Sequence, residues 1–84
     1  MIDKDMLDLL VENECLLADG YDKALIGVTV GNNPVAVYDV EVCIKSLMEK
    51  DGMSYEDAVE FFYYNTVSSY VGEKTPLFLL KNIK

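Results

Sequence analysis

DGMSYEDAVEFFYYNTVSSYVGEKTP, residues 51–76, is the stretch that decides the fold, because it encodes a complete helix with its own start and stop signals. Ser54 is placed to cap the N-terminus of this helix, and Asp57 three residues later is a weaker form of the capping box. Gly72 is a typical C-terminal stop, and a Thr-Pro pair follows it. The sequence therefore predicts a helix over 55–71 that carries most of the aromatic residues of the chain.

Four aromatic residues in succession, 61–64, limit what this helix can bury. Successive helix residues are about 100° apart, so the four side chains cannot all face one core. The expected core face consists of Ala58, Phe61, Phe62, Asn65 and Ser69. Tyr63 and Tyr70 then remain near the surface. A buried Asn65 would need a hydrogen-bond partner, and we expect backbone of a strand or loop to provide it.

A second helix is expected immediately upstream, over 40–50. Its apolar residues recur at the ideal amphipathic spacing, at Val40, Cys43, Ile44, Leu47 and Met48. Asp39 is placed to cap the N-terminus of this helix, and Gly52 can end it in a conformation with positive φ.

The β-branched run 24–30 and the segment 35–38 predict two strands, which the turn 31–34 joins into a hairpin. Gly27 within the first strand indicates a bulge or the close approach of another element. The other expected elements are a short helix capped by Asp3 with an apolar stripe at Met6, Leu7, Leu10 and Val11, a brief strand over 15–17 and a short strand over 77–80.

Together these elements predict a single α+β domain over residues 1–84. We expect a small antiparallel sheet, made of the hairpin and the C-terminal strand, with about three helices packed on it. Hydrophobic residues make up 51% of the chain, which is too many for a disordered chain of this charge. A chain this short buries a modest fraction of its surface, so its stability is expected to be marginal or shared with a partner.

The net charge of −8 is unevenly distributed along the chain. Residues 1–60 carry fourteen acids and four lysines, a net charge of −10, whereas residues 61–84 carry one acid and three lysines, a net charge of +2. The electric field of the first segment repels nucleic acid and favours basic partners.

The residues that this chain lacks argue against catalysis. It contains no Arg, His or Trp, so the guanidinium fork, the usual general base and the commonest metal ligand are missing. Its serines therefore lack an activating His, and its glycines do not form a phosphate-binding loop. Asp19, Asp22 and Asp39 lack calcium-loop spacing and are explained as turn and cap residues. We expect no enzyme activity, no cofactor and no metal.

Cys15 and Cys43 are far apart and flanked by apolar residues, so buried free thiols in a reducing compartment are expected rather than a disulfide. No apolar run approaches the roughly 18 residues that span a bilayer. The acidic N-terminus is unlike a signal peptide. The expected location is the cytoplasm, with no membrane and no direct nucleic-acid partner.

One string of motifs, spread over residues 19–80, resembles a known family. The motifs are DGYD at 19–22, ALIGV at 24–28, PVAVYD at 34–39, Cys43-Ile44, Leu47-Met48, DGM at 51–53, EDA at 56–58, Phe62, Asn65, YVGE at 70–73 and Thr75-Pro76. In this pattern the chain is similar to small uncharacterised proteins encoded by tailed bacteriophages and by phage-derived regions of bacterial genomes. The resemblance implies a phage setting inside a bacterial host cell, and it implies no particular activity.

Two functional hypotheses follow. The first is a non-enzymatic phage accessory protein that binds a host or phage protein, such as one whose basic groove accepts an acidic surface in place of a nucleic-acid backbone. Solubility alone is the alternative explanation of the acids. The candidate interaction surface consists of Tyr63, Tyr70, Asp19, Asp22, Glu56 and Glu60. The second hypothesis is a homo-oligomer, such as a homodimer, that sequesters a small molecule in interface pockets lined by Tyr38, Tyr70 and Asn65.

Overall fold

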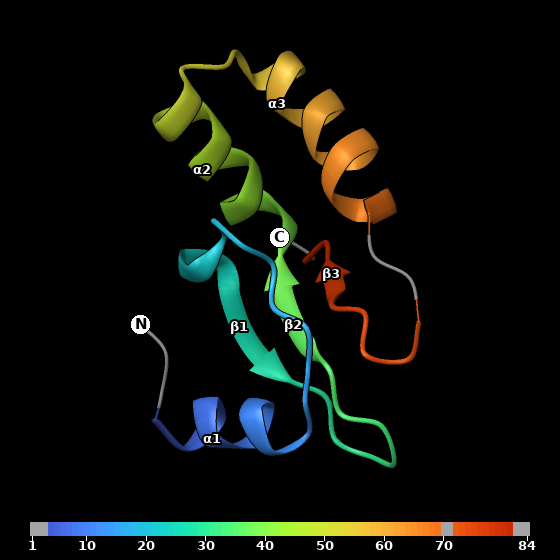
Figure 1. The fold of residues 1–84 in the computed structure, drawn as a ribbon. Coiled ribbons are helices and arrows are strands. Elements are labelled where there is room, and N and C mark those ends of the chain that lie inside the picture. Colours follow the sequence, from blue (N-terminus) through green and yellow to red (C-terminus); the bar gives the residue numbers. More distant parts are fainter. Residues whose placement is uncertain (1–3, 70–71, 82–84) are drawn as a thin grey trace.

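The fold is built around a three-stranded sheet with the strand order β1-β2-β3. In Figure 1, α1 lies at one end of this sheet and α2 and α3 lie at the other. The computed structural model describes residues 4–69 and 72–81. The regular elements are α1 (Lys4–Glu12), β1 (Leu25–Val28), β2 (Ala36–Asp39), α2 (Val40–Asp51), α3 (Tyr55–Phe61) and β3 (Leu77–Leu79), with short helical turns at Asp22–Ala24, Phe62–Thr66 and Val67–Ser69. The predicted α+β class, built from a hairpin, a C-terminal strand and three helices, is confirmed. Three predictions fall outside the described residues. These are the helix cap at Asp3, the surface position of Tyr70 and the helix end at Val71.

The sheet is mixed, so the prediction of a wholly antiparallel sheet is wrong. β1 and β2 pair antiparallel as the expected hairpin, and the register shifts by one residue between Leu25 and Gly27. This bulge confirms the interpretation of Gly27. β3 instead pairs parallel with β2. The chain leaves the end of β2 through α2 and returns through α3, and such a helical crossover brings the next strand back in the same direction.

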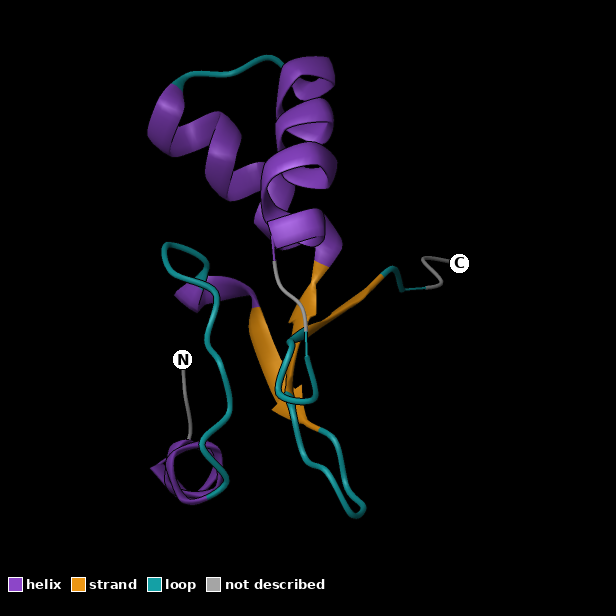
Figure 2. Cartoon of the chain, turned by 45° about the vertical axis from the view of Figure 1, so that its right-hand side comes forward, coloured by secondary structure: helices purple, strands orange, loops and turns teal. Residues whose placement is uncertain are grey.

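The expected brief strand over 15–17 does not form, and this segment runs as a loop over one face of the sheet (Figure 2). Its backbone and side chains bond to loops and to a tyrosine rather than to a strand edge. The Cys15 thiol donates to the carbonyl of Pro34 (3.1 Å), and the Ala18 N–H donates to the Tyr38 hydroxyl (2.8 Å). A segment that lies over a sheet face cannot join the ladder, whose hydrogen bonds lie in the plane of the sheet.

Asp39 joins the end of β2 to the start of α2, as the sequence predicts. Its carboxylate accepts hydrogen bonds from the backbone N–H of Glu41 (2.9 Å) and of Val42 (3.4 Å), and it pairs with the ammonium of Lys81 (3.2 Å). Burial raises the pKa of the Asp39 carboxyl, but the bond from Lys81 and the two backbone bonds outweigh it and hold the pKa below its ordinary value. Gly52 ends α2 in the left-handed conformation (φ 67°).

The long aromatic helix contains a π turn that changes which residues it buries. α3 continues into the π turn Phe62–Thr66, in which the Val67 N–H reaches back to the carbonyl of Phe62. The extra residue in this turn moves Thr66 into the position that Asn65 would occupy in a regular α-helix. Thr66 is buried as a result, next to Ala58 and Phe62, which are buried as predicted, whereas the other expected core residues Phe61, Asn65 and Ser69 are exposed.

The buried core joins all layers of the fold. Phe62 is fully buried, and its ring meets Tyr21 and Phe78 edge-on at centroid distances of 6.0 and 5.2 Å. Tyr38, also fully buried, contacts the ring of Phe78 at 5.8 Å. The hydroxyls of Tyr21 and Thr66 share a buried hydrogen bond of 2.8 Å. These contacts attach the helix to the sheet and to the turn before β1.

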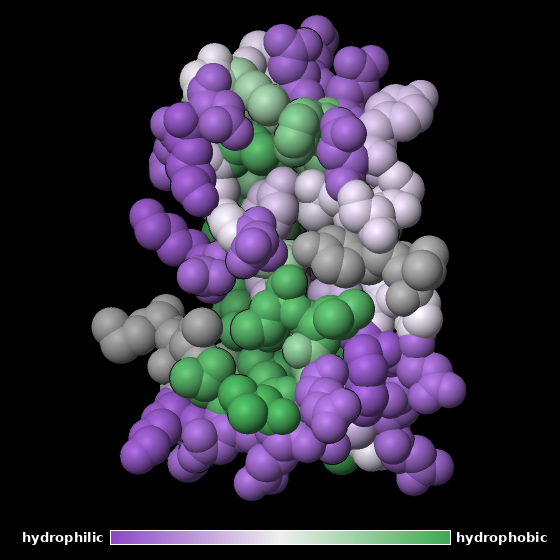
Figure 3. Space-filling view, in the orientation of Figure 1, coloured by the Kyte–Doolittle hydropathy of each residue, from purple (hydrophilic) through white to green (hydrophobic). Residues whose placement is uncertain are grey.

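Two parts of the surface remain apolar. Of the stripe predicted for α1, only Leu10 is buried, and Figure 3 shows hydrophobic residues gathered over α1 and the segment that follows it. The second part is the outer sheet face, on the side away from Tyr38 and Phe78. There the register places Leu77 beside Val37, and Ile26, Leu77 and Leu79 are each about half exposed. No helix within 4–69 and 72–81 is both long enough and apolar enough to cross a membrane.

The first prediction concerns the Asp39 cap. We expect Asp39→Ala to lower the free energy of unfolding at pH 7 by about 1–2 kcal/mol, because two N–H groups of α2 lose their acceptor. The folded-state pKa lies below the ordinary value of 3.8. The stabilisation is therefore present above about pH 4 and disappears as the pH falls through the folded value. Urea unfolding of both proteins between pH 7 and pH 3 measures the difference.

Ser54→Ala is the matched control, because the Ser54 hydroxyl caps α3 by accepting from the Asp57 N–H (3.2 Å) and does not titrate. Its effect on stability should persist in acid. A difference between wild type and Asp39→Ala that stays constant down to pH 3 would contradict the role given to this carboxylate.

Candidate binding groove

Three adjoining hollows form one groove along the seam between the turn that precedes β1, α2 and α3. We call this the acidic groove. The hollow between the turn and α2 has a volume of about 230 Å³, the middle one about 230 Å³ and the outer one, along α3, about 520 Å³. The first two share Gly20, Ser46 and Lys50, and Phe61 lines both the middle and the outer hollow.

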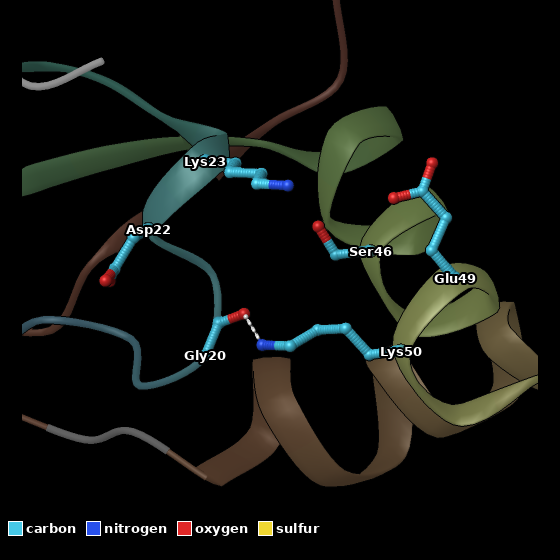
Figure 4. A pocket seen from close by; sticks show the side chains of 6 residues that line it. All are labelled: Gly20, Asp22, Lys23, Ser46, Glu49 and Lys50. Atoms are coloured by element: carbon cyan, nitrogen blue, oxygen red, sulfur yellow. Dashed lines mark hydrogen bonds between the residues drawn. The ribbon is translucent and has the colours of Figure 1, made fainter.

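The groove exists because the turn 19–24 is attached to both helices. Lys50, in the last turn of α2, donates a hydrogen bond to the carbonyl of Gly20 (3.0 Å; Figure 4). Gly20 has a positive φ of 87°, a conformation that favours glycine. On the side of α3, the buried bond between the hydroxyls of Tyr21 and Thr66 holds the same turn. The bond from Lys50 therefore holds the turn against α2, and the bond between Tyr21 and Thr66 holds it against the π turn that continues α3.

The groove carries a net charge of −4. Six carboxylates line it against two lysines, Lys23 and Lys50; the acids are Asp19, Asp22, Glu49, Asp51, Asp57 and Glu60. Its outer part also has aromatic side chains, because Phe61 is 38% exposed and Tyr64 is 77% exposed. An acidic concave surface with exposed rings suits a basic partner that also offers apolar side chains.

The candidate surface predicted from the sequence is divided by the structure. Asp19, Asp22 and Glu60 are exposed and line the acidic groove. Glu56 and Tyr63 are exposed on α3 and on the π turn but do not line any of the three hollows, so they flank the groove. Tyr70 lies outside the described residues.

Sequence reasoning missed several lining residues, above all Ser46, Lys50 and Phe61. Phe61 was assigned to the core because it lies on the same predicted helix face as Ala58 and Phe62, but the structure leaves it at the edge of that face, 38% exposed. Ser46 lies between apolar positions of α2, and Lys50 was interpreted only as a favourable charge at a helix end. No local signal indicates that the turn 19–24 packs against α2.

The two cysteines lie in different surroundings, and only Cys43 is held where its thiol is unreactive. Cys43 is fully buried, and burial, followed by the charge of Asp39, raises the pKa of its thiol to about 12. Cys15 is free but only partly buried, so the expectation that both thiols are buried holds for Cys43 alone. In the part of the chain that the structure describes, no three Cys, Asp or Glu side chains are grouped so that they could hold a metal ion.

The chain was compared with known protein families, curated proteins and solved structures. No known protein family, no curated protein and no solved structure matches the chain. The resemblance to small phage-encoded proteins stays a prediction.

The second prediction follows from the burial of Cys43. We expect iodoacetamide at pH 8 to alkylate Cys15 in the folded protein and to leave Cys43 unmodified, because a thiol with a pKa of about 12 forms very little thiolate at that pH. Peptide mass spectrometry measures modification at each site. Denaturant should make both thiols reactive, which is the internal control. Equal labelling rates in the folded protein would show that Cys43 is not held in this environment.

Proposed function

We propose that this protein is a non-enzymatic accessory protein that binds a basic host or phage protein through the acidic groove. The observation that carries the proposal is the placement of six carboxylates around a concave surface that contains the exposed ring of Phe61. The phage setting rests on the sequence resemblance, and with it the cytoplasm of a bacterial host as the place of action.

Electrostatics favours a basic partner. Residues with carboxylates on three separate elements, the turn, α2 and α3, line one seam, so their fields add over the groove. One of the two groove lysines, Lys50, already donates to the Gly20 carbonyl. Such a surface accelerates the encounter with a positively charged partner, and this effect weakens with salt because the charges are exposed.

The aromatic residues provide the contacts that hold a partner after the encounter. Tyr64 and Phe61 are exposed beside Glu60 in the outer hollow, and Tyr63 is 46% exposed on the neighbouring side of the helix. Tyr is enriched among the residues that dominate binding energy at interfaces. A basic segment that carries an apolar side chain therefore fits this part of the groove best.

The sequestering homo-oligomer is the second candidate, and one part of it needs correction. Tyr38 cannot line an interface pocket, because it is 1% exposed and its hydroxyl accepts the Ala18 N–H. Asn65, in contrast, is exposed in the outer hollow. Self-association itself is favoured by a different observation, the outer sheet face, where Ile26, Leu77 and Leu79 are half exposed.

The third prediction tests the groove. We expect the tagged protein to capture a basic protein from bacterial lysate at low salt, and Asp57→Asn/Glu60→Gln to reduce this capture about 10-fold, because two carboxylates beside the aromatic anchors are lost. Mass spectrometry identifies the captured protein, and calorimetry with the purified partner measures its affinity. High salt should weaken binding of the wild type.

Asp8→Asn/Glu12→Gln is the matched control, because it removes the same charge from exposed positions of α1, which lies at the opposite end of the molecule (Figure 1). This control should bind like the wild type. Recovery of no specific partner at either salt concentration, or equal losses in both double variants, would sink the proposal.

The fourth prediction tests self-association. If the outer sheet face pairs two copies, light scattering should show a mass that rises towards twice the monomer with concentration, and Leu79→Lys should restore the monomer by placing a charge in the apolar contact. Val30→Lys is the control, because Val30 is 99% exposed in the hairpin loop. A mass that stays monomeric at high concentration excludes this second candidate.

A further inference from the structure

The hydroxyl of Ser46 points into the hollow between the turn and α2 without a protein partner. Ser46 is only 7% exposed, and Figure 4 shows its oxygen directed towards the side chain of Lys23. Within residues 4–69 and 72–81 no hydrogen bond to this hydroxyl is found, and its oxygen is not among the fully enclosed polar atoms that lack a partner, so solvent can reach it through the hollow. Ser68 and Ser69 show the usual alternative, because their hydroxyls donate to backbone carbonyls four residues earlier. A nearly buried hydroxyl that is left open to a hollow indicates that a ligand or water completes its bonding.

Two lysine side chains line the same hollow from different sides. The Lys50 ammonium donates one of its three N–H bonds to the Gly20 carbonyl (3.0 Å), which positions it and leaves two donors free. The Lys23 side chain extends from the opposite wall towards Ser46, and it forms no salt bridge with the acids of the described residues (Figure 4). Donors from two walls and a hydroxyl between them thus face one volume of about 230 Å³.

We propose that this hollow binds a small oxyanion, a carboxylate or phosphate group, through Lys23, Ser46 and Lys50. Lysine is a point-charge donor for such groups, and the hydroxyl adds a directed hydrogen bond. The volume suits a ligand smaller than most drug-sized molecules. Because the chain has no Arg, the site lacks a bidentate contact, and we expect binding in the millimolar range.

The acids of the hollow make the proposal more specific. Glu49 lies one helical turn after Ser46 and lines the same space, so its carboxylate weakens the binding of an anion. Asp22 also lines the hollow, but its carboxylate is turned away from the space between Lys23 and Ser46 (Figure 4). Removing the charge of Glu49 should therefore strengthen binding, whereas removing a donor should weaken it.

This site does not depend on the basic partner proposed above. The groove as a whole attracts cations, whereas the hollow between the turn and α2 is proposed to bind an anion. Failure of the capture experiment would leave the oxyanion site untouched, and failure of anion binding would leave the groove variants of α3 unaffected.

The fifth prediction is tested by titrating the ¹⁵N-labelled protein with sodium phosphate and, separately, with sodium acetate, while sodium chloride keeps the ionic strength constant. We expect saturable shifts of the amide signals of Gly20, Lys23 and Ser46 with at least one of the two anions. Saturation by phosphate alone or by acetate alone identifies the preferred group. Ser46→Ala and Lys23→Gln should each weaken binding about 5-fold, and Glu49→Gln should strengthen it about 3-fold.

Lys45→Gln is the matched control, because Lys45 is exposed on α2, does not line the hollow and changes the net charge as Lys23→Gln does. Its affinity should equal that of the wild type. Ala favours the helix more than Ser does, so a loss of binding in Ser46→Ala is not a loss of folding. Shifts that never saturate with either anion, or equal losses in Lys45→Gln and Lys23→Gln, would overturn the proposal.

Discussion

The buried ring of Phe62 is the contact on which the rest of this small structure depends. It is fully buried, and it meets Tyr21 from the turn and Phe78 from β3 edge-on. Within residues 4–69 and 72–81, no other fully buried ring of the aromatic helix reaches the sheet. Truncating a buried side chain of this size to Ala costs about 3–5 kcal/mol, which is a large share of the roughly 5–15 kcal/mol that typically stabilises a domain. The ring of Phe62 is therefore the largest single contact that positions the helix on the sheet, beside the packing of Ala58 and the bond between Tyr21 and Thr66.

The groove follows from that position. Once Phe62 fixes the aromatic helix, the hydrogen bond between Tyr21 and Thr66 holds the turn 19–24 against it, and the bond from Lys50 holds the turn against α2. Three elements then meet along one seam, and the carboxylates that each carries are brought together. An acidic surface that is spread along the sequence becomes a concave one only through these contacts.

The chain combines surfaces of opposite character. The acidic groove lies between α2, α3 and the turn, whereas the outer sheet face and α1 expose apolar side chains such as Leu79 and Val11. A domain of this size cannot cover every apolar side chain with its own residues. The groove carries a net negative charge, while Lys23, Ser46 and Lys50 line its hollow next to the turn.

The sequence by itself determined the elements that depend on neighbouring residues. The Asp39 cap and the Gly52 stop define α2, and the bulge at Gly27 was predicted, because each involves bonds or dihedral angles within a few residues. The acids Asp19, Asp22 and Glu60 were assigned to the surface that became the groove, since exposed charge is readable from composition and pattern.

Only the tertiary structure decided the features that join distant parts of the chain. The parallel direction of β3 depends on how α2 and α3 return the chain to the sheet. The π turn, which exchanges Asn65 for Thr66 in the core, forms where Phe62 and Thr66 both have buried partners. The hollow around Ser46 exists because a turn and a helix that are separate in the sequence form its two walls. Sequence patterns predict bonds between residues that are close in the sequence. These three features instead arise from packing between residues that are far apart in the sequence.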